Sequence, residues 1–528
     1  MTPLATTEEE VEERERERER ERGEERRRKK RDTMVELNGA LLLEVLLGFV
    51  LLFVLLLSKS LVALIRKKYA LRLVPMAPES VPIFGHALTL MNSVPWDKFC
   101  EWKAKVGPVV RVNIMHKELI LIDDPPLLKQ VFQSRMQRYS KDVDFSYYPF
   151  MPLLGTGLVT AEGHLWRRQR SMVSVHFRVE ILDEIVGISM KGALRLSEKL
   201  EAFRGKKDYV PIAEEFRHLT LQVIGEAILS MSHTEADRVF PLLYLPIMEE
   251  ANKRSLRPWR EYMPNGDWFR HKKRISDLDN YIKELLRKRW NKRFPDGSRK
   301  CPLPAEDIID RIMDDVAKQQ GDWNKQVEMQ LCYEIKTFML AGHETSAAML
   351  AWALYELTQN PRCMEKVKEE AEKAFPKDGS YPTKDAISGM DYTYAVLKEA
   401  LRKYSVVPVV TRVTKQEDTL YDYKIPKGTT IGLLLQSVHH REDIWPDPDQ
   451  FKPERFLETK KIEPYTFLPF IDGPRNCLGQ HLALLEGRVI LAYLAKTFNF
   501  RTFTDNEGEK ASLVVPIAPL NNMRMLVE

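Results

Sequence analysis

The sequence predicts a mainly α-helical protein with a minor β region, preceded by one N-terminal transmembrane helix. Its 528 residues are 44% hydrophobic, which is enough to form a substantial core. A long apolar run lies near the N-terminus. The remainder of the chain has long helical periodicities and a few short strand-like runs. Together these observations predict a membrane anchor followed by a large helical domain.

The composition excludes several classes of protein. The cysteines are five in number and show no C-x-x-C spacing. They therefore predict neither a disulfide framework nor a zinc site, and they indicate a reducing compartment. The net charge of +5 is small for this length, and no basic patch with interleaved aromatic residues stands out. We therefore expect no nucleic-acid partner.

Residues 1–33 form a charged, low-complexity extension. The run from Glu8 to Arg31 alternates Glu and Arg and has no apolar face. Opposite charges at i,i+3 and like charges at i,i+4 leave a solvated helix and disorder both open, and we expect disorder or a frayed helix. The segment is either a disordered extension or absent from the mature protein. A chain that starts at Met34 would carry its basic cluster after the apolar run, which favours a cytosolic domain.

Residues 34–66 contain the predicted membrane anchor. From Gly39 to Leu57 the run is nineteen residues long and is interrupted only by Glu44, and a helix needs about 20 residues to cross a bilayer. A buried core helix is the alternative, but such a helix seldom lacks a polar face and basic flanks. A cleaved signal peptide fits less well, because the run is too long and no small-residue cleavage site follows it.

Residues 67–89 are basic and proline-rich, and residues 90–528 should form one domain. Prolines at 75, 78 and 82 fix φ and disfavour helix, so we expect a stiff extended linker. Beyond it we find no internal repeat and no flexible linker. Helical patterns include VGISMKGALRLSEKLEAF and DLDNYIKELLRKRW, and strand-like runs include VVRVNI, LILI and TTIGLLL.

Cys477 lies in an unusual setting within FLPFIDGPRNCLGQHLALLE, residues 467–486. Gly473 and Gly479 allow tight turns that would point amide groups at the sulfur. Apolar residues then recur at helical spacing, so a helix should begin just after the cysteine and, with Arg475, favour a thiolate. His481 would lie beside the cysteine backbone, which argues against a nucleophile with a histidine base. A lone thiolate makes no zinc or iron–sulfur site, but it suffices as an axial ligand of haem iron.

The loop resembles the Phe-x-x-Gly-x-Arg-x-Cys-x-Gly signature of the cytochrome P-450 haem-thiolate monooxygenases. The matching residues are Phe470, Gly473, Arg475, Cys477 and Gly479. The resemblance covers roughly residues 75–525 and is to the eukaryotic, membrane-anchored microsomal type. It implies the cytochrome P-450 fold, with Cys477 as axial ligand of haem b and the other four residues around the cofactor.

A second matching segment is AGHET, residues 341–345, inside a long apolar helical pattern. An acid followed by an alcohol in a buried helix is costly unless both groups are bonded or used. The alternative is a threonine bonded to its i−4 carbonyl and an acid paired elsewhere. The resemblance implies that Ala341 borders the haem, Gly342 lets the helix bulge over it, Thr345 steadies dioxygen and Glu344 relays protons.

Further motifs imply support for the cofactor. Glu399 and Arg402 alone would be a surface pair worth about a few tenths of a kcal/mol. The resemblance implies instead a buried structural network of Glu399, Arg402 and Arg455 beneath the cysteine loop. It also implies that the haem propionates are bound by Trp166, Arg170, Arg412 and Arg475.

The resemblance implies a monooxygenase that inserts one oxygen atom of O2 into a lipophilic substrate, such as a fatty acid, sterol, carotenoid or other terpenoid. Residues 235–265 are similar to the branch of carotenoid and fatty-acid hydroxylases. No flavin or nicotinamide fingerprint occurs, so electrons from NADPH should arrive through a membrane-bound reductase. We expect the endoplasmic reticulum membrane, with the catalytic domain in the cytosol. An O2-independent isomerase or lyase and a non-enzymatic haem sensor are the alternatives, and Glu344 and Thr345 count against both.

Overall fold

The computed structural model describes residues 8–177, 179–295, 301, 303–320, 323–457, 462–503, 515–519 and 521–528. The chain divides into two compact units, Met1–Arg72 and Leu73–Glu528. The second unit contains the predicted haem loop and the AGHET segment.

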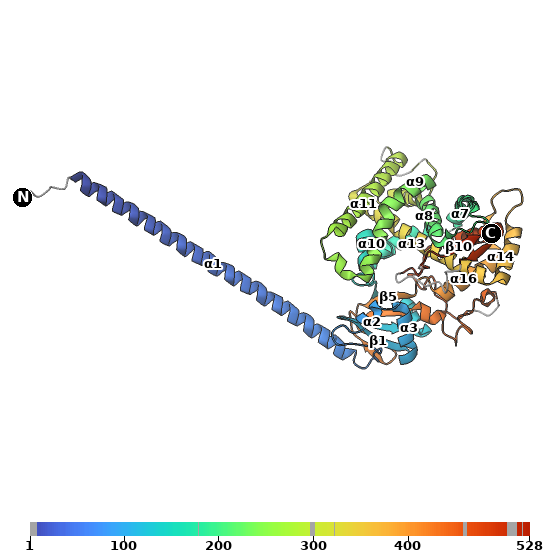
Figure 1. The fold of residues 1–528 in the computed structure, drawn as a ribbon, viewed down its shortest axis with the longest axis horizontal. Helices are drawn as coiled ribbons and strands as arrows, with labels where there is room; N and C mark the ends of the chain where they lie inside the picture. Colours follow the sequence, from blue (N-terminus) through green and yellow to red (C-terminus); the bar gives the residue numbers. More distant parts are fainter. Residues whose placement is uncertain are drawn as a thin grey trace, which may run out of the picture. The chain divides into compact units, whose positions relative to one another are not determined.

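The first unit is built on one helix, α1 (Glu8–Ala70), which is labelled in Figure 1. The charged run, expected to be disordered or frayed, belongs to this helix. Its continuity with the apolar run explains the difference, because a helix that is already nucleated extends at little cost. The stretch Glu44–Ala70 is long and apolar enough to cross a membrane, and none of it is buried inside the protein.

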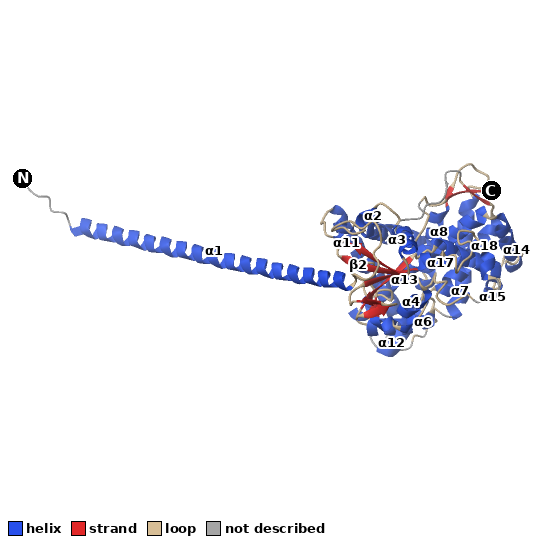
Figure 2. Ribbon diagram, turned by 90° about the horizontal axis from the view of Figure 1, so that it is seen from below, coloured by secondary structure: helices blue, strands red, loops and turns tan. Residues whose placement is uncertain are grey.

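The second unit is mainly helical, as predicted, with strands confined to small sheets (Figure 2). Its helices are α2 (Ala87–Met91), α3 (Pro95–Val106), α4 (Pro125–Lys129), α5 (Met151–Leu154), α6 (Gly163–His176), α7 (Val179–Glu201), α8 (Ile212–Leu229), α9 (His233–Val239), α10 (Leu245–Leu256), α11 (Gly266–Arg293), α12 (Ile308–Gln320), α13 (Lys325–Gln359), α14 (Pro361–Ala374), α15 (Lys384–Ser388), α16 (Asp391–Tyr404), α17 (Leu435–His439) and α18 (Gln480–Thr497).

The largest sheet has five strands in the order β1-β2-β8-β5-β3. All its neighbours are antiparallel except β2 and β8. The three predicted strands fall in β1, β2 and β8. The strands of this unit are β1 (Val109–Ile114), β2 (Lys117–Ile122), β3 (Tyr139–Ser140), β4 (Val210–Pro211), β5 (Val409–Thr414), β6 (Asp418–Leu420), β7 (Tyr423–Ile425), β8 (Thr430–Leu434), β9 (Phe500–Thr502) and β10 (Arg524–Val527).

Residues 73–89 of the predicted linker belong to the second unit, whereas residues 67–72 belong to the first. The segment is not the stiff extended chain that we expected: it runs through turns and isolated bridges, and it pairs with β1, where the Ala77 amide donates to the Arg111 carbonyl at 2.9 Å. Its proline-rich composition could not reveal this pairing, because the partner strand lies 30 or so residues away. Gly85 adopts a φ of 59° in this segment, and a Cβ there would lie 2.3 Å from the Asn113 carbonyl oxygen.

Helix α13 is the centre of the core. It begins at an N-cap, Asn324, whose side chain accepts hydrogen bonds from the amides of Gln326 and Val327 at 3.0 Å. Residues 346–354 are buried on every face of the helix, which is typical of a helix surrounded by others. It packs against α8, α16 and α18. The AGHET segment is thereby fixed in the middle of the unit.

Candidate active site

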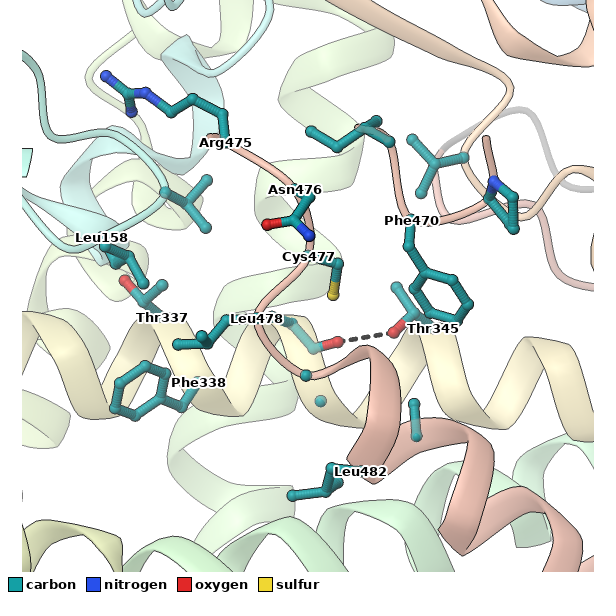
Figure 3. Close-up of a pocket in the computed structure, with 18 of the residues that line it drawn as sticks. Leu158, Thr337, Phe338, Thr345, Phe470, Arg475, Asn476, Cys477, Leu478 and Leu482 are labelled. Atoms are coloured by element: carbon teal, nitrogen blue, oxygen red, sulfur yellow. Dashed lines mark hydrogen bonds between the residues drawn. The ribbon is translucent and has the colours of Figure 1, made fainter. Parts of the chain in front are cut away.

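A cavity of about 310 Å³ lies between α13, α6 and the loop before α18. Its lining is mainly apolar, with side chains such as Phe338, Val406 and Val410. Figure 3 shows the Cys477 sulfur and Thr345 facing this cavity. The cavity brings together many of the residues predicted from the sequence, namely Trp166, Arg170, Ala341, Gly342, Thr345, Phe470, Arg475, Cys477 and Gly479.

The cysteine loop is held by backbone contacts. The Cys477 amide donates to the Phe470 carbonyl at 2.9 Å. Gly473 has a φ of 75°, and a Cβ there would lie 2.4 Å from the Phe132 carbonyl oxygen, so glycine is required. Gly479 differs from the expectation of a tight turn. It is the N-cap of α18 with an ordinary φ of −84°, and a Cβ there would meet no described protein atom within 4 Å.

Cys477 exposes its surface to the cavity and is enclosed by protein elsewhere. Burial raises the pKa of its thiol above the usual value. The Gly479 amide, the Arg170 guanidinium and the Gln480 amide act in the opposite direction. The two amides at the start of α18 were predicted to favour a thiolate, whereas the cation that acts on the sulfur is Arg170 of α6 instead of the predicted Arg475. In the protein alone the effect of burial on the thiol pKa is larger.

One end of the cavity is strongly cationic. Arg412 on β5 does not line the cavity, but its charge acts on Lys141 and Arg475, which do. It is 5% exposed, and its buried Nη2 atom has no hydrogen-bond partner among the described residues. Arg475 lies 4.0 Å above the Trp166 ring and donates to the Ala161 carbonyl at 2.8 Å. Burial, followed by repulsion from Arg412, lowers the pKa of Arg475 to about 10 against the attraction of Glu162. Within the described residues, Glu162 is the carboxylate paired with this arginine, at 3.0 Å.

The structure adds two residues that sequence analysis missed. Lys141 and Tyr147 line the same end of the cavity, and the Lys141 ammonium donates to the Tyr147 hydroxyl at 3.3 Å. Burial and the charges of Arg412 and Arg475 lower the pKa of Lys141 well below its ordinary value. Neither residue belongs to a motif, and their role follows only from the fold that places them beside Arg412.

Helix α13 contributes Thr345 and Gly342. The Thr345 hydroxyl donates to the Ala341 carbonyl at 2.6 Å, the i−4 bond that we considered as an alternative. A Cβ on Gly342 would lie 2.6 Å from Ile224 Cγ1 of α8. The glycine therefore allows α8 and α13 to approach closely, a role that the sequence did not reveal. The helix is continuous from Lys325 to Gln359.

Glu344 lines a second cavity that differs from the one reached by Thr345. This cavity is about 20 Å³, enough for roughly one water molecule, and Arg217 of α8 also lines it. The Glu344 carboxylate lies 3.7 Å from His343 Nε2, an atom that is fully buried. Adjacent residues of a helix point about 100° apart, so the acid and the alcohol serve different sides of α13.

The predicted network beneath the loop is buried and connected. Glu399 accepts from Arg402 at 2.8 and 2.9 Å and from Arg455 at 3.3 Å. Arg402 also donates to the His439 carbonyl at 2.8 Å. The His439 ring in turn accepts from the Leu468 amide at 2.8 Å, which links the network to the chain leading into the cysteine loop. His439, like Lys141 and Tyr147, belongs to no motif that the sequence showed.

Comparison with known proteins identifies similar chains. The family model described as "Cytochrome P450" matches residues 75–520. "Cytochrome P450 4c21" of Blattella germanica is 28% identical over 88% of this chain and 94% of that protein. "Cytokinin hydroxylase" of Arabidopsis thaliana is 29% identical over 71% of this chain and 72% of that protein. The crystal structure of the "cytochrome P450DA heme domain" has a TM-score of 0.75 at 23% identity, covering 86% of this chain and 97% of that one.

Proposed function

The chain belongs to the cytochrome P450 family and is a monooxygenase that uses haem, O2 and electrons from a reductase; from this premise we propose that Cys477 is the axial haem ligand. The supporting observation is a cysteine sulfur facing a large, mainly apolar cavity that has a cationic end. A haem needs both features, because its ring is apolar and its two propionates are anionic.

The residues present fit the cofactor. The buried Nη2 atom of Arg412 has no described partner, and a buried donor without an acceptor is costly. Arg475 and Lys141 both have lowered pKa values because burial and neighbouring cations oppose their charge. A dianionic group would relieve both problems. We assign the propionates to Arg412, Arg475, Lys141 and Trp166, with Phe470, Ala341 and Gly479 beside the ring and Gly473 shaping the loop.

When bound, the haem supplies oxygen activation and insertion, and a thiolate ligand favours cleavage of the O–O bond. The chain supplies the surroundings. The Thr345 hydroxyl lines the cavity and donates to the Ala341 carbonyl in this structure, and it would turn to hold a hydrogen bond to the oxygen substrate. Glu344 can exchange protons with water at the second cavity, beside Arg217. The apolar lining keeps bulk water from the reacting atoms.

For the substrate we infer a lipophilic molecule: a fatty acid, sterol, carotenoid or other terpenoid. The mainly apolar lining supports this assignment, as does the apolar stretch Glu44–Ala70. We place the protein in the endoplasmic reticulum membrane with its catalytic unit in the cytosol, where an NADPH-dependent reductase would supply electrons. Type I spectral titration with a panel of these lipids distinguishes the classes.

The decisive experiment on the ligand is the carbon monoxide spectrum of the reduced protein. Wild type should give a Soret band at about 450 nm, and Cys477→Ser should lose it. Cys363→Ser, at a buried cysteine that does not line the cavity, is the control and should keep the band. A folded, haem-loaded wild type without this band would overturn the assignment of Cys477.

A further inference from the structure

Arg170 makes its closest contacts with the cysteine loop itself. Its Nη1 donates to the Asn476 carbonyl oxygen at 2.9 Å, and its Nη2 donates to the Asn476 side-chain Oδ1 at 2.6 Å. Asn476 directly precedes Cys477, and its own amide donates to the Gly473 carbonyl at 3.0 Å. The Arg170 guanidinium on α6 therefore donates hydrogen bonds to both the main chain and the side chain of the residue next to the cysteine.

This contact is strong in physical terms. Both bonds have a charged donor, and a two-pronged guanidinium fixes orientation as well as distance. Arg170 is partly buried, so its charge has lost much of its hydration and depends on these acceptors. The loop side of the contact is short and stiff, because Gly473, Asn476 and Cys477 are joined by the turn described above.

We propose that Arg170 and Asn476 form a clamp that holds the Cys477 sulfur on the haem iron when the iron is reduced. The proposal rests on the assignment of Cys477 as haem ligand. Arg170 is a positioning residue in this role, since it acts on the sulfur through Asn476. Binding a propionate, which the sequence resemblance implies for Arg170, would be a separate task of the same side chain.

The two tasks can be separated because Asn476, which also lines the cavity, carries no positive charge for a propionate and contacts Arg170 directly. Asn476→Ala removes the acceptor that Arg170 Nη2 uses and leaves the guanidinium and its charge in place. Asn476→Asp keeps an acceptor oxygen at the same position. Arg168→Ala removes an exposed arginine from the same helix and is the matched control.

The experiment uses the full-length, haem-loaded protein in lipid nanodiscs. It measures haem content and the rate at which the reduced carbon monoxide complex converts from the band at about 450 nm to one at about 420 nm, the sign of lost thiolate ligation. We expect Asn476→Ala to keep its haem and convert roughly tenfold faster than wild type. Asn476→Asp and Arg168→Ala should convert at the wild-type rate.

Equal rates for Asn476→Ala and wild type would overturn the clamp and leave Arg170 with the propionates alone. If Asn476→Ala fails to retain haem, Asn476→Asp decides: the clamp requires that it retain haem and convert slowly, and a failure of both variants overturns it. A wild-type protein without the band at about 450 nm would instead refute the assignment of Cys477, so the two failures are distinguishable.

Discussion

Glu486 is a buried acid with a measurable consequence for stability. It lies on α18 with 1% of its surface exposed, and burial raises the pKa of its carboxyl from 4.5 to about 8, against a hydrogen bond from Ser346. Above pH 4.5 the unfolded chain releases this proton while the folded protein keeps it. The contribution of Glu486 to stability therefore falls as the pH rises from 4.5 to about 8.

We predict that Glu486→Gln removes this loss. The amide is neutral and has nearly the same shape, so the Tm of the variant should exceed that of wild type at pH 8 and approach it at pH 5. Thermal unfolding followed by circular dichroism measures both values. Glu365→Gln, at an exposed site on α14, is the control and should show no such difference. An equal offset at the two pH values would contradict the prediction.

Lys141 provides a second test at this scale. If it contacts a propionate, Lys141→Met removes a charge-assisted hydrogen bond and should speed haem transfer to apomyoglobin roughly tenfold. Lys129→Met, at an exposed site, should leave the rate unchanged. A Lys141→Met protein that holds haem as firmly as wild type would remove Lys141 from the binding set.

At the residue scale, the sequence was informative where chemistry requires fixed spacing. The loop around Cys477, the AGHET segment and Glu399 with Arg402 could all be found by pattern. The structure places Cys477 and Thr345 at one cavity, Glu344 at a second, and the Glu399–Arg402 pair in the interior. Lys141, Tyr147 and His439 could not be found in this way. Each acquires its role from a partner distant in sequence, and a single side chain of its type is more often structural or solvated.

At the scale of elements, α8 and α13 approach closely at Gly342. We predict that Gly342→Ala destabilises the protein by about 1–3 kcal/mol, because the new Cβ would meet Ile224 at 2.6 Å. Adding Ile224→Ala should restore part of this loss. Gly187→Ala is the control, since a Cβ there meets no described atom within 4 Å and alanine favours helix. Chemical denaturation of wild type and the three variants gives the comparison, and a Gly342→Ala protein as stable as wild type would contradict the prediction.

Whether a segment is a helix or a strand could be predicted well from its periodicity. The segments with which it pairs or packs could not. The strands β1, β2 and β8 were predicted, and β8 is buried along its whole length, as a continuous apolar run suggests. For the charged part of α1, the local spacing of charges gave no preference between helix and disorder. The apolar helix that continues it does favour helix, and the expectation did not take this into account. The pairing of residue 77 with β1 was missed because pairing depends on tertiary contacts.

At the scale of the whole molecule, the division at Leu73 predicts where the chain can be cut. Removing residues 1–72 should leave a folded, haem-binding unit that no longer pellets with membranes. Removing residues 1–89 should destroy haem binding, because His86 is fully buried and its ring contacts the Ala77 and Asn113 carbonyls at 3.0 Å. Haem content and membrane fractionation of the two truncations test this, and equal haem content would place the boundary nearer residue 90.

Helix α13 contributes residues to two separate cavities, a large one that is mainly apolar and a small one that is lined in part by Glu344 and Arg217. Thr345 lines the first cavity and Glu344 lines the second. In the roles proposed above, substrate size would be set on one side of the helix and protons would be supplied from the other. Evolution or engineering can therefore reshape the larger chamber for a new lipid without disturbing the smaller one. Conversely, substitutions around Arg217 should change the fraction of the reductase's electrons that is used to form product. They should leave substrate selectivity unchanged.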